Sequence, residues 1–290
     1  MPVGPTSADP RLPEHVTMTE HTAQTLVSLT FDDGLDVHLD VAMPMLEAHG
    51  MRGTFYVSPG AEPFAKRSGE WIAAAQRGHE LGNHTVFHPG VSSKPWVTEG
   101  IALDTYSLDR MRIELLAADR ILHMLDGRTS RSFAFPCSNP NLGKPGLPRR
   151  VLAKMGLDRT RLMGFVDRHN LDVGSRLVDY TPLVRDIFPS ARCGGVAADD
   201  LPARPGDWHR VRGIDGDGAT IAALDEALDM AIARKAFAAF VFHGVGGGHH
   251  LSVGLDVLDH LLRRLSREPS VQVLPFVDAA RVLQQETNHR

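Results

Sequence analysis

The sequence has few of the residues that mark several common classes of protein. Its 290 residues include only two cysteines, Cys137 and Cys193, which are too far apart for a CxxC site and too few for a disulfide framework. Neither sign of charge dominates, because 31 Lys and Arg stand against 35 Asp and Glu and give a net charge of −4. We therefore expect no nucleic acid partner, since phosphate-binding domains concentrate positive charge on one face.

Long apolar runs are also missing. The longest, such as Ala236 to Phe242, fall far short of the roughly 20 residues that a membrane-spanning helix needs, so we predict no membrane span. Residues 1–24 are polar, contain proline and lack the apolar stretch of a secretory leader. We interpret them as a polar N-terminal tail and expect a cytoplasmic protein.

The remaining sequence predicts one packed α/β domain. Strand-like runs alternate with helical ones and no break in composition separates them, which favours a parallel sheet in a single barrel-like or doubly wound domain. The predicted strands are Thr25–Phe31, Thr54–Val57, His79–Leu81, Ser132–Phe135, Phe237–Phe242 and Val271–Leu274. The predicted helices cover 37–49, 71–77, 108–125, a segment through 221–232, 255–265 and a last segment ending near Gln285. We predict no helix or strand for residues 157–210.

Polar side chains follow three of these strands. Asp32 and Asp33 follow the first, His84 and His88 follow the third, and His243 follows the strand that ends at Phe242. The carboxyl ends of parallel strands share one rim, so these side chains can meet there. A carboxylate with two imidazoles is a standard ligand set for a divalent catalytic metal.

Each motif taken alone also has a structural explanation. With 15 histidines in the chain, about 0.7 pairs spaced like His84 and His88 are expected by chance. Asp-Asp-Gly is typical of a helix N-cap or a turn, and a lone histidine after a strand is often structural. The combination, rather than any single motif, favours a metal site.

Two of these segments resemble a known family. Thr30-Phe31-Asp32-Asp33-Gly34 together with His84-Thr85-Val86-Phe87-His88-Pro89 is similar to the first two motifs of the polysaccharide deacetylase family (NodB homology, carbohydrate esterase family 4-like). The resemblance implies an irregular (β/α) barrel, related to the TIM barrel, as one catalytic domain over residues 25–290. It also implies a divalent metal, which we expect to be zinc, with cobalt, nickel or manganese as alternatives.

The resemblance further implies a role for each motif residue. Asp32 would be the general base, His243 the general acid, and Asp33, His84 and His88 the metal ligands. Phe133-Ala134-Phe135-Pro136-Cys137-Ser138 is similar to the third motif, so Pro136 would border the substrate and the backbone amide of Cys137 would hold the oxyanion.

One position departs from the family pattern. Ala134 stands where many members have an arginine that pairs with the base. Arg210 and Arg212 alternate in a strand-like stretch and could face the same side. We predict Arg212 as the replacement cation in the substrate site, with a solvated arginine as the alternative.

These implications predict a metal-dependent hydrolase that removes acetyl groups from an N- or O-acetylated carbohydrate or small molecule. The nearest alternative is a metal-dependent hydrolase of a non-peptide carbon–nitrogen bond in a cyclic imide or ureide. A non-haem iron oxygenase uses the same ligand types, but the α/β alternation argues against it. A catalytically inactive carbohydrate-binding protein is a further alternative, and we make no prediction of oligomeric state.

Overall fold

The structure is a computed structural model that describes residues 25–157, 161–169, 171–196 and 204–288. The predicted polar tail, residues 1–24, lies outside these described residues. Among the helices of the described ranges, none combines the length and apolar character that a bilayer crossing requires.

Seven parallel strands close into a barrel because β1 pairs with both β2 and β9. The order around the barrel is β1-β2-β3-β4-β7-β8-β9 and back to β1. Its strands are β1 (Thr25–Phe31), β2 (Thr54–Val57), β3 (Glu80–Asn83), β4 (Phe133–Ala134), β7 (Ala191–Val196), β8 (Val211–Asp215) and β9 (Ala238–Phe242). The predicted irregular (β/α) barrel is confirmed.

An eighth strand makes the closure irregular. Val27 pairs with Ala238 of β9 and with Val273 of β12 (Val271–Val273), so β9 and β12 lie on opposite edges of β1. β12 occupies the amino-terminal half of the edge whose carboxyl-terminal half pairs with β2. Two short pairs complete the described strands, β5 (Asn141–Leu142) with β6 (Val178–Asp179) and β10 (Gly244–Val245) with β11 (Ser252–Val253).

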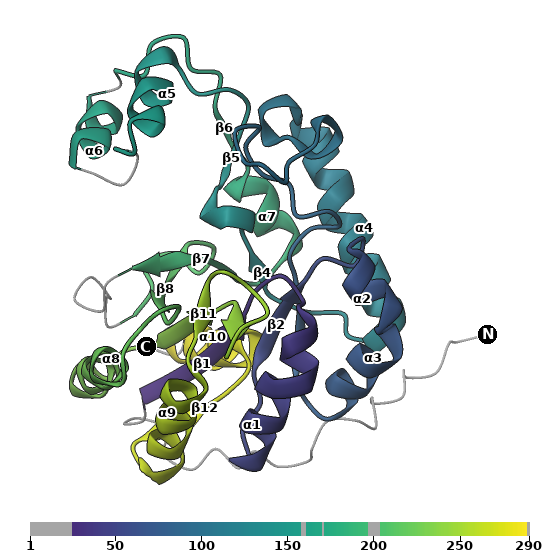
Figure 1. Cartoon of the computed structure of the whole chain (residues 1–290), viewed down its shortest axis with the longest axis vertical. Coiled ribbons are helices and arrows are strands. Elements are labelled where there is room, and N and C mark those ends of the chain that lie inside the picture. Colours follow the sequence, from purple (N-terminus) through teal and green to yellow (C-terminus); the bar gives the residue numbers. More distant parts are fainter. Residues whose placement is uncertain (1–24, 158–160, 170, 197–203, 289–290) are drawn as a thin grey trace.

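Helices surround the barrel, and two of them project away from it (Figure 1). Those around the barrel are α1 (Met43–Ala48), α2 (Glu62–Lys66), α3 (Ser68–Gln76), α4 (Leu108–Asp126), α7 (Thr181–Ile187), α8 (Ile221–Arg234), α9 (Leu255–Arg267) and α10 (Phe276–Asn288). The projecting pair is α5 (Leu147–Lys154) and α6 (Arg161–Arg168). Single turns occur at η1 (His38–Ala42), η2 (Glu99–Ile101), η3 (Leu103–Thr105) and η4 (Pro136–Ser138).

The predicted strands Thr25–Phe31 and Thr54–Val57 have the predicted bounds. The helix predicted over 37–49 begins instead as the π-helical turn η1, and the helix predicted over 71–77 begins earlier, at Ser68. β3 runs to Asn83 rather than ending at Leu81. β7 lies within residues 157–210, for which the sequence predicted no helix or strand.

Strand β1 is buried on both faces, and its two faces differ in polarity. Val27, Leu29 and Phe31 pack into the apolar core beneath the outer helices. The alternate residues face the barrel interior, where the Ser28 hydroxyl donates to the Leu274 carbonyl and the Thr30 hydroxyl donates to the Phe240 carbonyl. The interior of this barrel is therefore partly polar and hydrogen-bonded.

Glu80 organises the amino-terminal end of the barrel. Its fully buried carboxylate accepts hydrogen bonds from the Thr54 hydroxyl (2.8 Å) and from the Ser132 amide and hydroxyl (2.7 Å each). It also accepts from the Val277 amide (3.0 Å) in the first turn of α10, where the helix dipole favours negative charge. One side chain thus connects β2, β3, the start of β4 and α10.

We expect Glu80→Ala to lower the free energy of unfolding by about 3 kcal/mol, because four buried donors lose their acceptor at once. Urea denaturation followed by circular dichroism measures the change. Glu62→Ala is the control, since Glu62 is 76% exposed and pairs only with Lys66 among its described ion-pair partners. Equal denaturation midpoints for the two variants would contradict this role of Glu80.

Candidate active site

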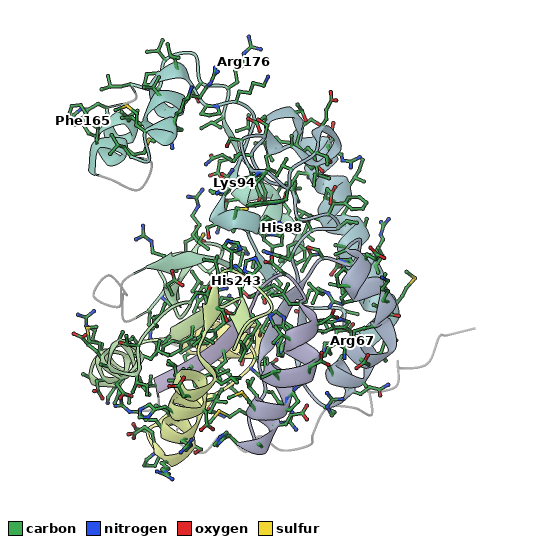
Figure 2. All side chains as sticks on the ribbon, in the orientation of Figure 1. Arg67, His88, Lys94, Phe165, Arg176 and His243 are labelled. Atoms are coloured by element: carbon green, nitrogen blue, oxygen red, sulfur yellow. The ribbon has the colours of Figure 1, made fainter. Side chains whose placement is uncertain are left out.

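The predicted site residues meet at the carboxyl-terminal rim of the barrel. Asp32 and Asp33 directly follow β1, His84 directly follows β3, and His243 directly follows β9. Closure of the barrel makes β1 and β9 neighbours, and the Asp32 amide donates to the Phe242 carbonyl (2.9 Å). Figure 2 shows His88 and His243 on this side of the barrel.

Asp33, His84 and His88 form a compact donor set. An Asp33 carboxylate oxygen lies 3.5 Å from His84 Nε2 and 3.2 Å from His88 Nε2, and one donor atom from each residue lies within 4.8 Å of the others. His84 Nδ1 lies 2.8 Å from the Ala134 carbonyl, so Nδ1 donates to that carbonyl and Nε2 is the ring nitrogen that faces the carboxylate. A ring nitrogen of each histidine and a carboxylate oxygen of Asp33 thus converge as possible ligand atoms, so these residues fit a metal.

The backbone around this set takes conformations that only a surrounding structure maintains. Five of the six non-glycine residues with positive φ in the described chain are at the site: Asp33, Thr85, His88, Cys137 and Ser138. Each such residue costs of order 1 kcal/mol or more. This concentration of unfavourable backbone geometry is typical of a functional site.

Two buried side chains hold the turn that carries both histidines. Asn83 accepts a hydrogen bond from the Thr85 amide (2.9 Å), and its own amide donates to the Leu115 carbonyl (3.1 Å). Glu114 of α4 accepts from the Val86 amide (3.0 Å). The turn is therefore fixed from the sheet below and from a helix beside it.

Asp32 pairs with an arginine inside the barrel. Arg192 Nη2 donates to Asp32 Oδ1, Arg192 Nη1 donates to the Cys193 carbonyl (2.8 Å), and the guanidinium lies 5.0 Å from the centroid of the Tyr56 ring. Burial alone would raise the pKa of Asp32, but the charge of Arg192, with those of His84 and His243, lowers it below its ordinary value. Asp32 is therefore an ionised, buried carboxylate beside the ligand set.

The expectation that Arg212 supplies this cation is wrong. Arg212 is exposed on β8, whereas Arg192 is 2% exposed and makes the ion pair. Arg192 pairs in register with Ala134 on the neighbouring strand, so the small side chain of Ala134 leaves room for a guanidinium from β7. The sequence shows that position 134 has no arginine. It does not show which strand pairs with that position.

His243 is held by two residues that the sequence analysis did not identify. Its Nδ1 lies 2.6 Å from Asp217 Oδ2, and its amide donates to Asp217 Oδ1 (3.0 Å). Burial alone would lower the pKa of His243, but the hydrogen bond with Asp217 and the charges of Asp32, Asp33 and Asp217 raise it to about 9. His243 is therefore a protonated acid at neutral pH.

The second residue is His38 of η1, which is fully buried. The Leu35 amide donates to His38 Nδ1 (3.2 Å), so the proton is on Nε2, which donates to the His243 carbonyl (2.7 Å). His38 thus joins the loop after Asp33 to the backbone of His243.

Pro136 and Cys137 lie on η4, directly beyond β4. Cys137 has φ of 52°. A Cβ placed on Gly90, two residues beyond His88, would lie 3.9 Å from Cys137 Sγ and 3.8 Å from Trp96 Nε1. The third motif therefore borders the loop that follows the ligand turn, on the same rim.

A family model described as polysaccharide deacetylase matches residues 19–159. The predicted resemblance to the polysaccharide deacetylase family is confirmed. The matched segment includes the first, second and third motifs, with Asp32, Asp33, His84, His88 and Cys137. His243 and Arg192 lie beyond it.

One solved structure shares the fold at low sequence identity, and two others are less similar. A putative polysaccharide deacetylase from Mycobacterium smegmatis is 13% identical, with 93% of each chain covered and a TM-score of 0.55. Peptidoglycan deacetylase PdaC from Bacillus subtilis is 14% identical, with 91% of this chain and 94% of that chain covered and a TM-score of 0.46. A CE4 family pseudoenzyme from Bacillus anthracis is 14% identical, with 89% of this chain and 66% of that chain covered and a TM-score of 0.45. A comparison with curated protein sequences found no match.

We expect Arg192→Met to lower the free energy of unfolding at pH 7 by about 3 kcal/mol or more, because it leaves the Asp32 charge buried without its partner. The loss should shrink as the pH falls through the range in which Asp32 becomes protonated, because the depressed pKa of Asp32 stabilises the fold only while the group is ionised. Arg212→Met is the matched control and should change stability little, since Arg212 is exposed. Equal losses in both variants, measured by urea denaturation at several pH values, would disprove the assignment of Arg192.

Proposed function

We propose that this protein is a metal-dependent hydrolase that removes acetyl groups from an N- or O-acetylated carbohydrate. The observation that carries the proposal is the position of the Asp33, His84 and His88 donor set beside an ionised carboxylate, Asp32, and a protonated imidazole, His243. A base and an acid with opposite charge states beside one cation site are what hydrolysis of an amide or ester requires. The family resemblance supports an acetyl group as the acyl group that is transferred to water.

Asp33, His84 and His88 would hold the metal, for which zinc is our first choice and cobalt, nickel or manganese are alternatives. Three protein ligands with mixed nitrogen and oxygen donors suit a catalytic site that keeps an open position. A divalent cation there supplies Lewis acidity, which polarises a carbonyl and acidifies water.

The chain's own residues would perform the proton transfers. Asp32, held ionised by Arg192, accepts the proton of the attacking water. The Cys137 amide donates a hydrogen bond to the oxyanion as it forms. His243, held protonated by Asp217, donates its proton to the leaving nitrogen or oxygen. Pro136 would fix the direction of the backbone before Cys137, so that the Cys137 amide faces the substrate.

We expect Asp33→Ala and His84→Ala to lose both the bound divalent ion and acetate release, because each removes one of three ligands. Elemental analysis of the purified protein and an acetate assay with N-acetylated and O-acetylated oligosaccharides measure the two losses. His123→Ala, an exposed histidine on α4, should retain both. Full turnover in either ligand variant would defeat the proposal, and ring opening of a cyclic imide without acetate release would favour the alternative hydrolase.

We expect Asp217→Asn to move the alkaline limb of the kcat/KM profile to lower pH by about 1 to 2 units, because the pKa of His243 falls when the charge and hydrogen bond of Asp217 are lost. The direction follows from the acid role, since only protonated His243 is active and its raised pKa extends activity toward about pH 9. Asp186→Asn on the exposed side of α7 controls for the change in net charge. An unmoved alkaline limb would exclude His243 as the acid.

A further inference from the structure

The projecting pair of helices belongs to the segment between β4 and β7, which leaves the barrel just beyond the active-site rim. We call residues 144–176 the lobe, of which 144–157, 161–169 and 171–176 are described. It contains α5 and α6 and stands clear of the barrel in Figure 1. Cys137 lies a few residues before its start, and in Figure 2 Phe165 and Arg176 of the lobe lie at the top of the view, with Lys94 and His88 below them toward the middle of the molecule.

The neck of the lobe is an ordered connection. Strands β5 and β6 pair antiparallel, and the Arg176 amide donates to the Lys144 carbonyl (2.9 Å). The Asp172 carboxylate accepts from the Gly146 amide (2.9 Å) and the Arg149 amide (3.2 Å) at the start of α5. The two ends of the lobe are therefore held together, and the helices above them have a defined base.

The lobe has a small apolar interior and also a large apolar exterior. Met163 and Val166 are 5% and 6% exposed. The exposed apolar side chains, with their exposed fractions, include Leu147 (65%), Val151 (46%), Met155 (65%), Leu162 (47%), Phe165 (51%) and Val173 (76%). Leu147, Val151 and Met155 follow one another at intervals of four and so share one side of α5. Several exposed apolar side chains in one short segment favour an interaction surface there.

The lobe also carries positive charge, in contrast to the rest of the chain. Residues 144–176 contain eight Lys and Arg against three Asp, whereas the remaining residues contain 23 Lys and Arg against 32 Asp and Glu. Among the described side chains of α5, Arg150 and Lys154 are exposed and one helical turn apart. Basic residues thus accompany the exposed apolar ones on α5.

We propose that the lobe docks on an anionic lipid bilayer surface. Amphipathic helices with basic and exposed apolar residues lie in the membrane interface, where apolar side chains enter the headgroup boundary and each Lys or Arg near anionic lipid contributes about 1 kcal/mol. A soluble polyanion would use the basic residues but would leave side chains such as Met155 and Val173 in water. A second copy joined lobe to lobe would bring two positively charged surfaces together, which is unfavourable.

Docking through the lobe would place the active-site rim close to the bilayer, because the lobe leaves the barrel beside Cys137. The substrate would then be a saccharide held at or near a membrane surface. This step depends on the proposed function, whereas the docking itself does not.

Co-sedimentation of the full chain with vesicles tests the proposal. One set of vesicles contains phosphatidylcholine alone and the other contains phosphatidylcholine with phosphatidylglycerol. We expect binding to the anionic vesicles to be at least about tenfold tighter and to weaken between about 0.1 M and 0.5 M salt, as screening requires. Asp33→Ala should bind vesicles like the wild type, so a failure of the catalytic proposal is distinguishable from a failure of this one.

Variants separate the two components of the surface. Met155→Ser with Val173→Ser removes apolar contact, and Arg150→Glu with Lys154→Glu reverses charge, so each pair should weaken binding at least about fivefold. The matched controls lie on α4, where Ile113 and Met124 are 62% and 76% exposed and Arg112 and Arg120 are exposed basic residues. Ile113→Ser with Met124→Ser and Arg112→Glu with Arg120→Glu should leave binding unchanged. Circular dichroism confirms that every variant is folded.

Four results would overturn the proposal. The first is no preference of the wild type for anionic vesicles, and the second is an equal loss of binding in the α4 controls. The third is a loss of binding in the charge variant alone, which would indicate a site for a soluble anion. The fourth is a concentration-dependent dimer in sedimentation velocity that the Met155→Ser and Val173→Ser variant abolishes, which would make a second copy the occupant.

Discussion

The pairing of β1 with β9 is the constraint on which the rest of the structure depends. Five residues of β1, from Val27 to Phe31, pair with five of β9, and this ladder converts an open sheet into a barrel. As a result, Asp32 and Asp33 become neighbours of His243, although about 200 residues separate them in the sequence. Because all seven barrel strands are parallel, their carboxyl ends share one rim and the side chains that follow them face one space.

Within that space, one buried and one partly buried ion pair give two titratable groups opposite charge states. Arg192 keeps Asp32 ionised, and Asp217 keeps His243 protonated. Neither state would hold in water-poor surroundings without its partner, because burial alone moves the pKa of Asp32 upward and that of His243 downward. The turn that carries His84 and His88 is fixed by Asn83 and Glu114, and His38 fixes the backbone of His243. The unfavourable positive φ angles at the rim persist because the hydrogen-bonded barrel below holds the backbone in place.

Much of this fold was predictable from the sequence because its strands are short apolar runs that end at turn residues. Thr54–Val57 is β-branched or aromatic throughout, and Thr25–Phe31 is rich in such residues, so both segments favour a strand. The segment 157–210 was not predictable, because β7 contains Arg192, Cys193 and two glycines and resembles a loop in composition. Its strand conformation comes from pairing with β4 and β8.

The sequence by itself determined the donor types of the site, since two aspartates and two histidines follow strand-like runs, and the family resemblance singled out Asp33, His84 and His88 as the ligand set. Only the tertiary structure decided which groups serve these residues. Arg192 replaces an arginine absent at position 134 because the two positions are in register on adjacent strands, and Asp217 meets His243 because β8 and β9 are neighbours. Register and strand order are properties of the closed barrel and have no local signature in the chain.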